Sequence, residues 1–80
     1  MIRVDGHTDD VPIAFSERFR SNWDISSARS ASVANYLLNN TPVEPGRVTI
    51  TGFADSQPIA DNTTPDGRAK NRRIEVIVDG

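Results

Sequence analysis

Residues 24–42, DISSARSASVANYLLNNTP, decide the fold, because they carry the strongest helix pattern in this sequence of 80 residues. Ile25, Val33 and Leu37 recur along one face of the predicted helix. Ser30 on the same side is small enough to let a sheet approach closely. One amphipathic helix of this length predicts a layered fold in which the helix packs on a sheet.

Both ends of this helix have recognisable signals. We expect it to begin around Asp24 to Ser26, because Asn22, Asp24 and Ser26 each offer a side-chain oxygen to the free amides of a first turn. Pro42 ends it, since proline does not continue the helix and biases Thr41 away from helical angles.

Two strand patterns flank the helix. Residues 2–5 alternate apolar and polar side chains and end near Gly6, and residues 47–51 alternate in the same way up to Gly52. A strand, a helix and a second strand at this spacing predict a right-handed βαβ crossover with parallel strands.

The rest of the chain predicts a third strand. Residues 64–67 (TPDG) read as a turn, residues 68–72 as a short helix, and residues 74–78 as a strand. The predicted fold class is therefore α/β: an α+β sandwich of the order βαβ(α)β, with a mixed sheet and helices mainly on one face. The polar loops 7–22 and 53–72 should gather at one end of it.

Size and composition exclude several classes of protein. Eighty residues form one small domain, and the net charge of −2 argues against a nucleic-acid binder. The positive charge gathers in residues 68–73, either as a solvated face or as an anion-facing one. The chain has no cysteine and no apolar run of the ~20 residues that a membrane helix needs. We therefore expect the chain, as given, to be soluble.

Asp9 and Arg29 are the leading candidates for a binding site. Asp9 closely follows the first strand, and Arg29 lies about one turn into the helix. A guanidinium there would offer a planar fork to a ligand carboxylate, assisted by the first-turn amides, while Asp9 balanced a ligand ammonium. The alternative is an Asp9–Arg29 brace between loop and helix. The functional interpretation predicts a pocket for a small zwitterion, and binding rather than catalysis.

Metal and catalytic interpretations have less support. His7, Asp9 and Asp10 offer three possible metal ligands, but neighbouring residues rarely all point to one ion, and His7 is the only histidine. No serine lies in a Gly-x-Ser-x-Gly elbow, and Walker, Rossmann and zinc-finger patterns are absent. We expect no enzyme activity, no cofactor and no metal site.

The sequence resembles the OmpA-like peptidoglycan-binding domain. The resemblance extends over nearly all of the chain, in ordered blocks that end in Asn-Arg-Arg-Ile-Glu. The matching blocks are His7-Thr8-Asp9; Asn22; Ile25-Ser26-x-x-Arg29 with Val33 and Tyr36-Leu37; Gly52-Phe53-Ala54-Asp55 with Gln57-Pro58; and residues 67–75.

This resemblance implies non-covalent binding of peptidoglycan, chiefly of the diaminopimelate residue of its stem peptide. Asp9 and Arg29 fall on the positions that grip the ligand. The further residues expected at the pocket are Thr8, Asn22, Arg72 and Arg73.

Within the family, the chain is most similar to the periplasmic domain of MotB-type flagellar motor stator proteins. The likeness lies in residues 7–13 (HTDDVPI), residues 21–24 (SNWD) and residues 62–65 (NTTP). It implies a flagellar motor protein of the inner membrane that anchors to the cell wall. It also implies a homodimer in the full-length protein and an ion-channel subunit as partner.

Two departures from the family pattern stand out. Ser30 occupies a position where alanine is more usual, and it should be tolerated if its hydroxyl bonds back into the helix. The family's domain normally begins with another strand and helix, so residues 1–80 are expected to be an N-terminally truncated part of it. Three alternatives stay open: a wall-anchoring domain of an outer-membrane porin or lipoprotein, a protein-interaction module, and a metal-dependent hydrolase.

Overall fold

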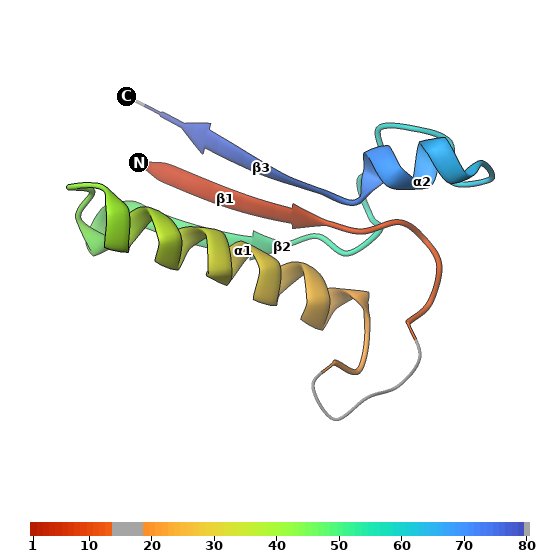
Figure 1. Ribbon diagram of the computed structural model, residues 1–80, viewed down its shortest axis with the longest axis horizontal. Coiled ribbons are helices and arrows are strands. Elements are labelled where there is room, and N and C mark those ends of the chain that lie inside the picture. The colour runs from red at the N-terminus through yellow and green to blue at the C-terminus, as the bar shows by residue number, and fades with distance from the viewer. Residues whose placement is uncertain (14–18, 80) are drawn as a thin grey trace.

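The computed structural model describes residues 1–13 and 19–79, and within them a three-stranded sheet carries one long helix on a face (Figure 1). Residues 14–18, the middle of the predicted ligand loop 7–22, lie outside the described residues. The elements are, in chain order, β1 (Ile2–His7), α1 (Asn22–Asn40), the 3-10 helix η1 (Pro45–Arg47), β2 (Val48–Gly52), α2 (Pro65–Asn71) and β3 (Arg73–Val78).

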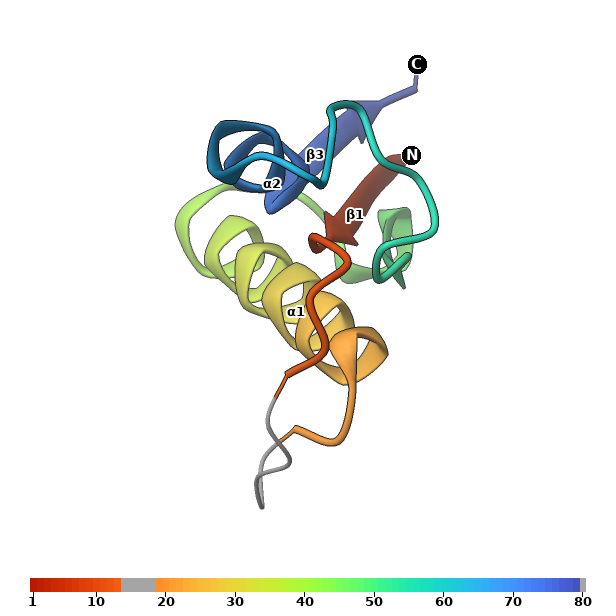
Figure 2. The same cartoon turned by 90° about the vertical axis from the view of Figure 1, so that its right-hand side faces the viewer.

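The sheet has the order β2-β1-β3, with the first strand in the centre. β1 runs parallel to β2, in a register that pairs Ile2 with Val48, and antiparallel to β3, in a register that pairs Ile2 with Val78. This confirms two predictions: the strands that precede and follow the long helix in the sequence are parallel, and the sheet is mixed. Seen from the end where β1 stops, α1 lies along one face of the strands (Figure 2).

Small residues allow α1 to approach the sheet closely. The buried positions of the helix are Ser26, Ser30 and Ala34, spaced four residues apart on one face. Gly6 of β1 and Gly52 of β2 lie under this face, and a methyl group added to either would collide with Ser26 and its neighbours. The short distance between the layers therefore requires small side chains on both sides.

Serine hydroxyls join the two layers where an apolar core would otherwise be needed. Ser30 Oγ donates to the carbonyl oxygen of Thr51 (3.1 Å), and Ser26 Oγ accepts from the amide of Ala54 (3.1 Å). The Ser30 hydroxyl thus bonds across to β2 and not back into its own helix. Ile25, Val33 and Leu37 are only half-buried, beside the contact and not in its centre.

Both helices begin earlier than the sequence predicted. α1 starts at Asn22, after an N-cap Ser21 whose side chain makes no capping hydrogen bond. α2 starts at Pro65, and the Thr64 hydroxyl caps it by accepting from the amide of Gly67 (3.0 Å). The predicted turn over residues 64–67 is wrong, because proline at the first helical position fixes an angle that suits a helix start as well as a turn.

The short helix lies beyond the end of the strands, whereas α1 covers a face (Figure 1). The opposite face of the sheet carries pairs of polar side chains. Arg3 Nε lies 3.0 Å from Asp5 Oδ1, and His7 Nε2 lies 2.9 Å from Glu75 Oε2. No helix in the described ranges is long and apolar enough to cross a membrane.

Candidate functional site

The candidate site lies at the end of the sheet where β1 stops. Beyond the paired strands, the amide of Phe53 donates to the carbonyl oxygen of Gly6 (2.9 Å) and the amide of Thr8 to that of Ala54 (2.8 Å). These bonds fix the loop after β1 to the loop after β2. The N-terminal part of α1 and the whole of α2 reach the same end (Figures 1 and 2).

A pocket of about 220 Å³ opens here, between the loop after β1, the first turns of α1 and the end of α2. Its volume is below the roughly 300–1,000 Å³ of sites that enclose a whole small ligand, so it suits one end of a larger molecule. The residues that line it are Thr8, Asp9, Val11, Pro12, Ile13, Asn22, Ile25, Arg29 and Arg72. Five of the six residues predicted for the site therefore meet in one pocket.

Asp9 is the buried anion of this pocket, with 8% of its surface exposed. Its Oδ2 accepts from Nη1 of Arg72 at 2.7 Å, and its Oδ1 accepts from the amide of Val11 at 3.1 Å. The brace from Asp9 thus goes to Arg72 and not to Arg29. Two of the about four lone-pair sites of the carboxylate are used in this way.

Asn22 and Thr8 fix the backbone around that carboxylate. Asn22 Nδ2 donates to the carbonyl oxygens of Asp9 (3.3 Å) and Val11 (3.1 Å), and the Thr8 hydroxyl donates to the Asp9 carbonyl oxygen (2.8 Å). The first residue of α1 therefore holds the loop after β1 in place. This fixes the backbone from which the Asp9 side chain extends.

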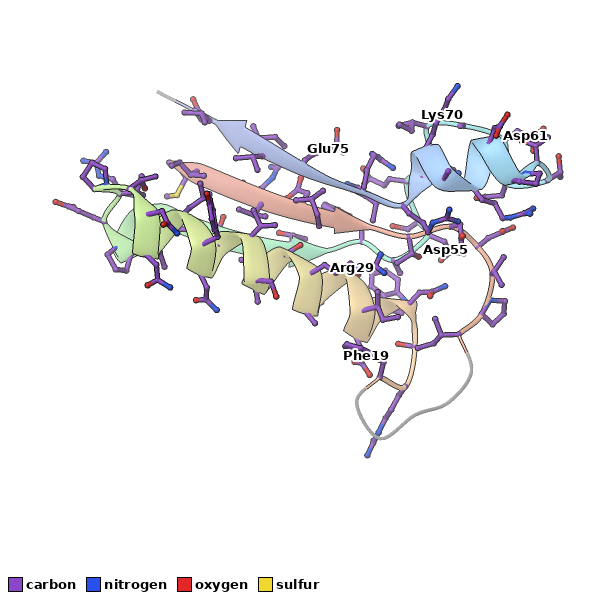
Figure 3. All side chains as sticks on the ribbon, viewed as in Figure 1. Phe19, Arg29, Asp55, Asp61, Lys70 and Glu75 are labelled. Carbon is purple, nitrogen blue, oxygen red and sulfur yellow. The ribbon has the colours of Figure 1, made fainter. Side chains whose placement is uncertain are left out.

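Arg29 is the second guanidinium of the pocket. It lies on α1, one turn after Ile25, and its label in Figure 3 lies along the helix towards the end where the loops gather. Across residues 1–13 and 19–79 it makes no hydrogen bond and no ion pair, and it is exposed. The pocket holds two guanidinium groups and one carboxylate, so a formal positive charge is left to attract an anion.

Arg73 does not line this pocket, although it was predicted to. Arg73 starts β3, and its guanidinium donates to the Gln57 carbonyl oxygen (3.0 Å) and lies 3.1 Å from the Glu75 carboxylate. Its side chain is only 15% exposed. Arg72 caps α2 while Arg73 belongs to a strand, so the two neighbours extend to different sides.

Arg72 is positioned by the buried Asn71 next to it. The Asn71 side-chain oxygen accepts from the amides of Ile59 (2.8 Å) and Ala60 (3.0 Å), and its nitrogen donates to Asn62 Oδ1 (2.7 Å). One fully buried amide thus ties the loop after β2 to the end of α2. This fixes the place from which Arg72 reaches Asp9.

The three candidate metal ligands diverge. His7 lies 2.9 Å from Glu75 on the face away from α1, Asp9 pairs with Arg72 inside the pocket, and Asp10 is exposed. Among the residues that the structure describes, no three histidine or acidic side chains are grouped closely enough to hold a metal ion. The described side chains therefore do not form the metal site that the His7-Asp10 segment left open.

Sequence reasoning missed the apolar wall of the pocket. Val11, Pro12, Ile13 and Ile25 line it beside the charged groups. The signal was present, because Val11-Pro12-Ile13 is an apolar run inside an otherwise polar loop. A wall of this kind lowers the local dielectric constant and strengthens the hydrogen bonds of a bound ion.

The chain belongs to the OmpA family, whose model matches residues 1–72. This agrees with the resemblance that the ordered sequence blocks indicated.

Named proteins of different kinds are similar to the chain. Motility protein B of Bacillus subtilis (strain 168) is 39% identical over 77 residues, which are 96% of this chain and 29% of that protein. The peptidoglycan-binding protein ArfA of Mycobacterium bovis is 38% identical over 77 residues, 96% of this chain and 22% of that protein. The chain thus spans less than a third of the length of these relatives.

A solved structure shares the fold closely. The cell wall anchor of the T6SS from Pseudomonas aeruginosa superposes with a TM-score of 0.86 at 44% identity, over 94% of this chain and 51% of that one. The fold and the sequence therefore lead to the same group of proteins.

Proposed function

We propose that the pocket binds the zwitterionic tip of a peptidoglycan stem peptide, its diaminopimelate residue, and so holds the protein to the cell wall without a covalent bond. The domain acts by binding and performs no reaction. The observation that carries this proposal is the Arg29 guanidinium, which no described residue pairs with, beside a buried and already oriented Asp9.

Arg29 supplies the grip on the carboxylate of the ligand. Its planar fork makes two parallel hydrogen bonds to a carboxylate, which are stronger than neutral ones. Because Arg29 makes no hydrogen bond and no ion pair with the described residues, its full donor capacity is available to a ligand. The amides in the first turn of α1, which no side chain of Ser21 caps, add positive potential on the same side.

Asp9 supplies the grip on the ammonium group. Its two remaining lone-pair sites face a pocket whose other charged groups are guanidinium groups. The hydrogen bonds from Arg72 and Val11 hold it in one orientation, so little conformational entropy is lost on binding. A ligand with only one of the two charges would leave half of this arrangement unmatched.

The membership in the OmpA family and the relatives support the same ligand. One relative is named for peptidoglycan binding and one solved neighbour is named a cell wall anchor. Diaminopimelate has a free amino-acid end that projects from the stem peptide, and the pocket suits a ligand end of that size.

The test is retention of the protein on purified cell wall. We expect Arg29→Ala to reduce the affinity about ten- to hundredfold, because charge-assisted hydrogen bonds to the ligand are lost. Asp9→Ala should have a similar effect. Arg29→Lys should restore only part of the binding, since an ammonium group does not make the planar fork.

Arg47→Ala is the matched control. Arg47 is an exposed arginine on η1, at the opposite end of the sheet, and its removal should leave retention unchanged. Circular dichroism should be the same for all variants. If Arg29→Ala and Asp9→Ala both sediment with the wall as the parent does, the pocket is not the binding site.

We infer that the whole protein is a flagellar stator subunit, and that the chain is the periplasmic part of an inner-membrane protein that forms a homodimer. The likeness to motility protein B supports this host, while the T6SS anchor shows that related domains have other hosts. Co-purification of an ion-channel subunit with the full-length protein tests the inference, and a different membrane partner would refute it.

A further inference from the structure

His7 is a buried titratable residue that does not line the pocket. It is the last residue of β1 and the only histidine of the chain, and 2% of its surface is exposed. Gly6 before it lies under α1, so the His7 side chain extends from the other face of the sheet. Thr8 and Asp9, which follow it, line the pocket. A change at the His7 ring therefore begins two residues from the pocket carboxylate.

The surroundings of the His7 ring suit its neutral form. Its Nδ1 is buried and makes no hydrogen bond with a described residue, and its Nε2 lies 2.9 Å from Oε2 of Glu75 on β3 (Figure 3). A neutral ring with its proton on Nε2 has only a lone pair at Nδ1. Protonation would add an N–H group there, and a buried donor without an acceptor is costly.

Charged groups of β1 and β3 act on the His7 ring in opposite directions. Glu75 and Asp5 favour the protonated ring, while Arg73 disfavours it. Both carboxylates already have cationic partners, because Arg3 Nε lies 3.0 Å from Asp5 Oδ1 and Arg73 Nη2 lies 3.1 Å from Glu75 Oε2. Burial has the largest effect, and together with Arg73 it lowers the pKa of His7 below its usual 6.5.

Phe53 connects the His7 ring to the pocket. It contributes an uncharged ring from the loop after β2, stacked on His7 with centroids 5.1 Å apart and planes at 4°. Ala54, the next residue, has a positive φ of 51°, which a residue other than glycine keeps only where its surroundings hold it. The Ala54 carbonyl oxygen accepts from the amide of Thr8 at 2.8 Å, one residue before Asp9. The stack therefore supports the backbone that carries Asp9.

A second connection to the pocket runs along β3. Oε2 of Glu75 lies 2.9 Å from His7 Nε2 and 3.1 Å from Arg73 Nη2, so the two residues share one carboxylate oxygen. Arg72, which precedes Arg73, binds Oδ2 of Asp9 through Nη1 at 2.7 Å. A charged His7 ring competes with Arg73 for the Glu75 carboxylate, directly beside Arg72. Both connections thus end at Asp9.

We propose that His7 is a positioning residue of the pocket, which keeps the Asp9 carboxylate in place only while the His7 ring is neutral, so that binding to the cell wall weakens in acid. Protonation leaves an N–H group at Nδ1 without an acceptor. The ring then turns from Phe53 towards water, and the two loops that the stack joins loosen. This inference rests on the proposed function, because it acts on the grip of Asp9 on the ligand ammonium group.

The test is the pH profile of binding to purified cell wall between pH 7.5 and pH 5.0. We expect the parent to bind about three- to tenfold less tightly at pH 5.0, a part of the cost of an unsatisfied buried donor. His7→Phe keeps a ring on Phe53 and carries no proton. It should bind like the parent at pH 7.5 and lose less affinity at pH 5.0. The wall and the other pocket residues are the same in both measurements, so the difference between the profiles belongs to His7.

Nuclear magnetic resonance on the parent identifies the titrating group. Since His7 is the only histidine, its ring protons report a single ionisation, and the midpoint of that titration should coincide with the midpoint of the fall in affinity. His7→Ala removes the stacked ring as well as the proton, so it should bind weakly already at pH 7.5. Glu44→Gln is the control, because it removes an exposed carboxylate at the opposite end of the sheet and should leave the profile unchanged. Circular dichroism at each pH checks that the proteins are folded.

The outcomes separate this inference from the proposed function. Identical pH profiles of the parent and His7→Phe would refute the requirement for a neutral ring, and so would a midpoint of the affinity that differs from that of the ring protons. If His7→Ala binds like the parent at every pH, the ring does not position Asp9. Unaltered retention of Arg29→Ala at pH 7.5 would instead refute the proposed function.

Discussion

The two ends of the sheet both carry a hollow, and the larger one is the poorer candidate for a site. At the end where β1 begins, a hollow of about 430 Å³ is lined by Ile2, Val43 and Val78 and by the exposed residues Glu44 and Arg47. At the end where β1 stops, the pocket of about 220 Å³ contains a buried carboxylate and a guanidinium that has no partner among the described residues.

The ion pairs at the two ends explain why. Arg47 Nε and Glu44 Oε2 are 3.8 Å apart, and the two side chains are 69% and 79% exposed. This pair therefore contributes little free energy to stability or to recognition. Arg72 Nη1 and Asp9 Oδ2 are 2.7 Å apart with Asp9 largely buried, and this pair holds a carboxylate that lines the pocket in one orientation. The size of a hollow therefore says less about function than whether its charges are fixed in place.

The largest expected effect is on stability at the site end. Gly6→Ala would drive a methyl group into the Ser26 carbonyl of α1, so the helix or the strand would have to shift. We expect a loss of about 3 kcal/mol or more in the free energy of unfolding, at the upper end of overpacking effects, measured by urea denaturation.

Gly46→Ala is the matched change at the opposite end. A methyl group at Gly46 meets no atom within 4 Å, so the free energy of unfolding should stay almost unchanged. Equal losses from Gly6→Ala and Gly46→Ala would contradict the close packing of α1 on β1.

A smaller effect should separate the neighbouring arginines. Arg72→Ala removes the partner of the Asp9 carboxylate, and we expect about a tenfold loss of affinity for cell wall, equivalent to roughly 1.4 kcal/mol. Arg73→Ala breaks contacts on the other face of the sheet and should lower stability without changing wall affinity. Equal losses of affinity in both variants would place Arg73 at the ligand after all.

The smallest effect concerns pH and His7. Burial lowers the pKa of His7 below its usual 6.5, the nearby Arg73 lowers it further, and Glu75 and Asp5 oppose this. The unfolded chain therefore binds a proton more readily than the folded one. The contribution of His7 to stability is complete above pH 6.5 and is lost as the pH falls below that value.

Urea denaturation at pH 7.5 and pH 5.5 measures this effect. The free energy of unfolding should be lower at pH 5.5, and His7→Phe should reduce the difference, since phenylalanine fits the stacked position on Phe53 and carries no proton. A parent protein that is more stable at the lower pH would show that the Glu75 carboxylate dominates.

The periodic elements could be predicted because they depend on neighbours in the sequence. The alternation before Gly52 gave β2 its observed end, and Pro42 marked the end of α1 within two residues. The start of α2 was predicted wrongly, since Pro65 suits a turn and a helix equally. The sequence could not predict which arginine pairs with Asp9. Both Arg29 and Arg72 are far from Asp9 in the sequence and reach the same pocket, and only the fold brings Arg72 within hydrogen-bond distance.

The amino-acid order by itself determined the helix, the three strands, the parallel crossover and the residue types of the site, because these follow from local periodicity and from side-chain chemistry. Only the tertiary structure decided which charges are paired. It joined Asp9 to Arg72, left Arg29 without a partner among the described residues, and turned Arg73 to the other face. Those outcomes depend on distances of a few ångströms between segments far apart in the chain, and a linear pattern does not contain them.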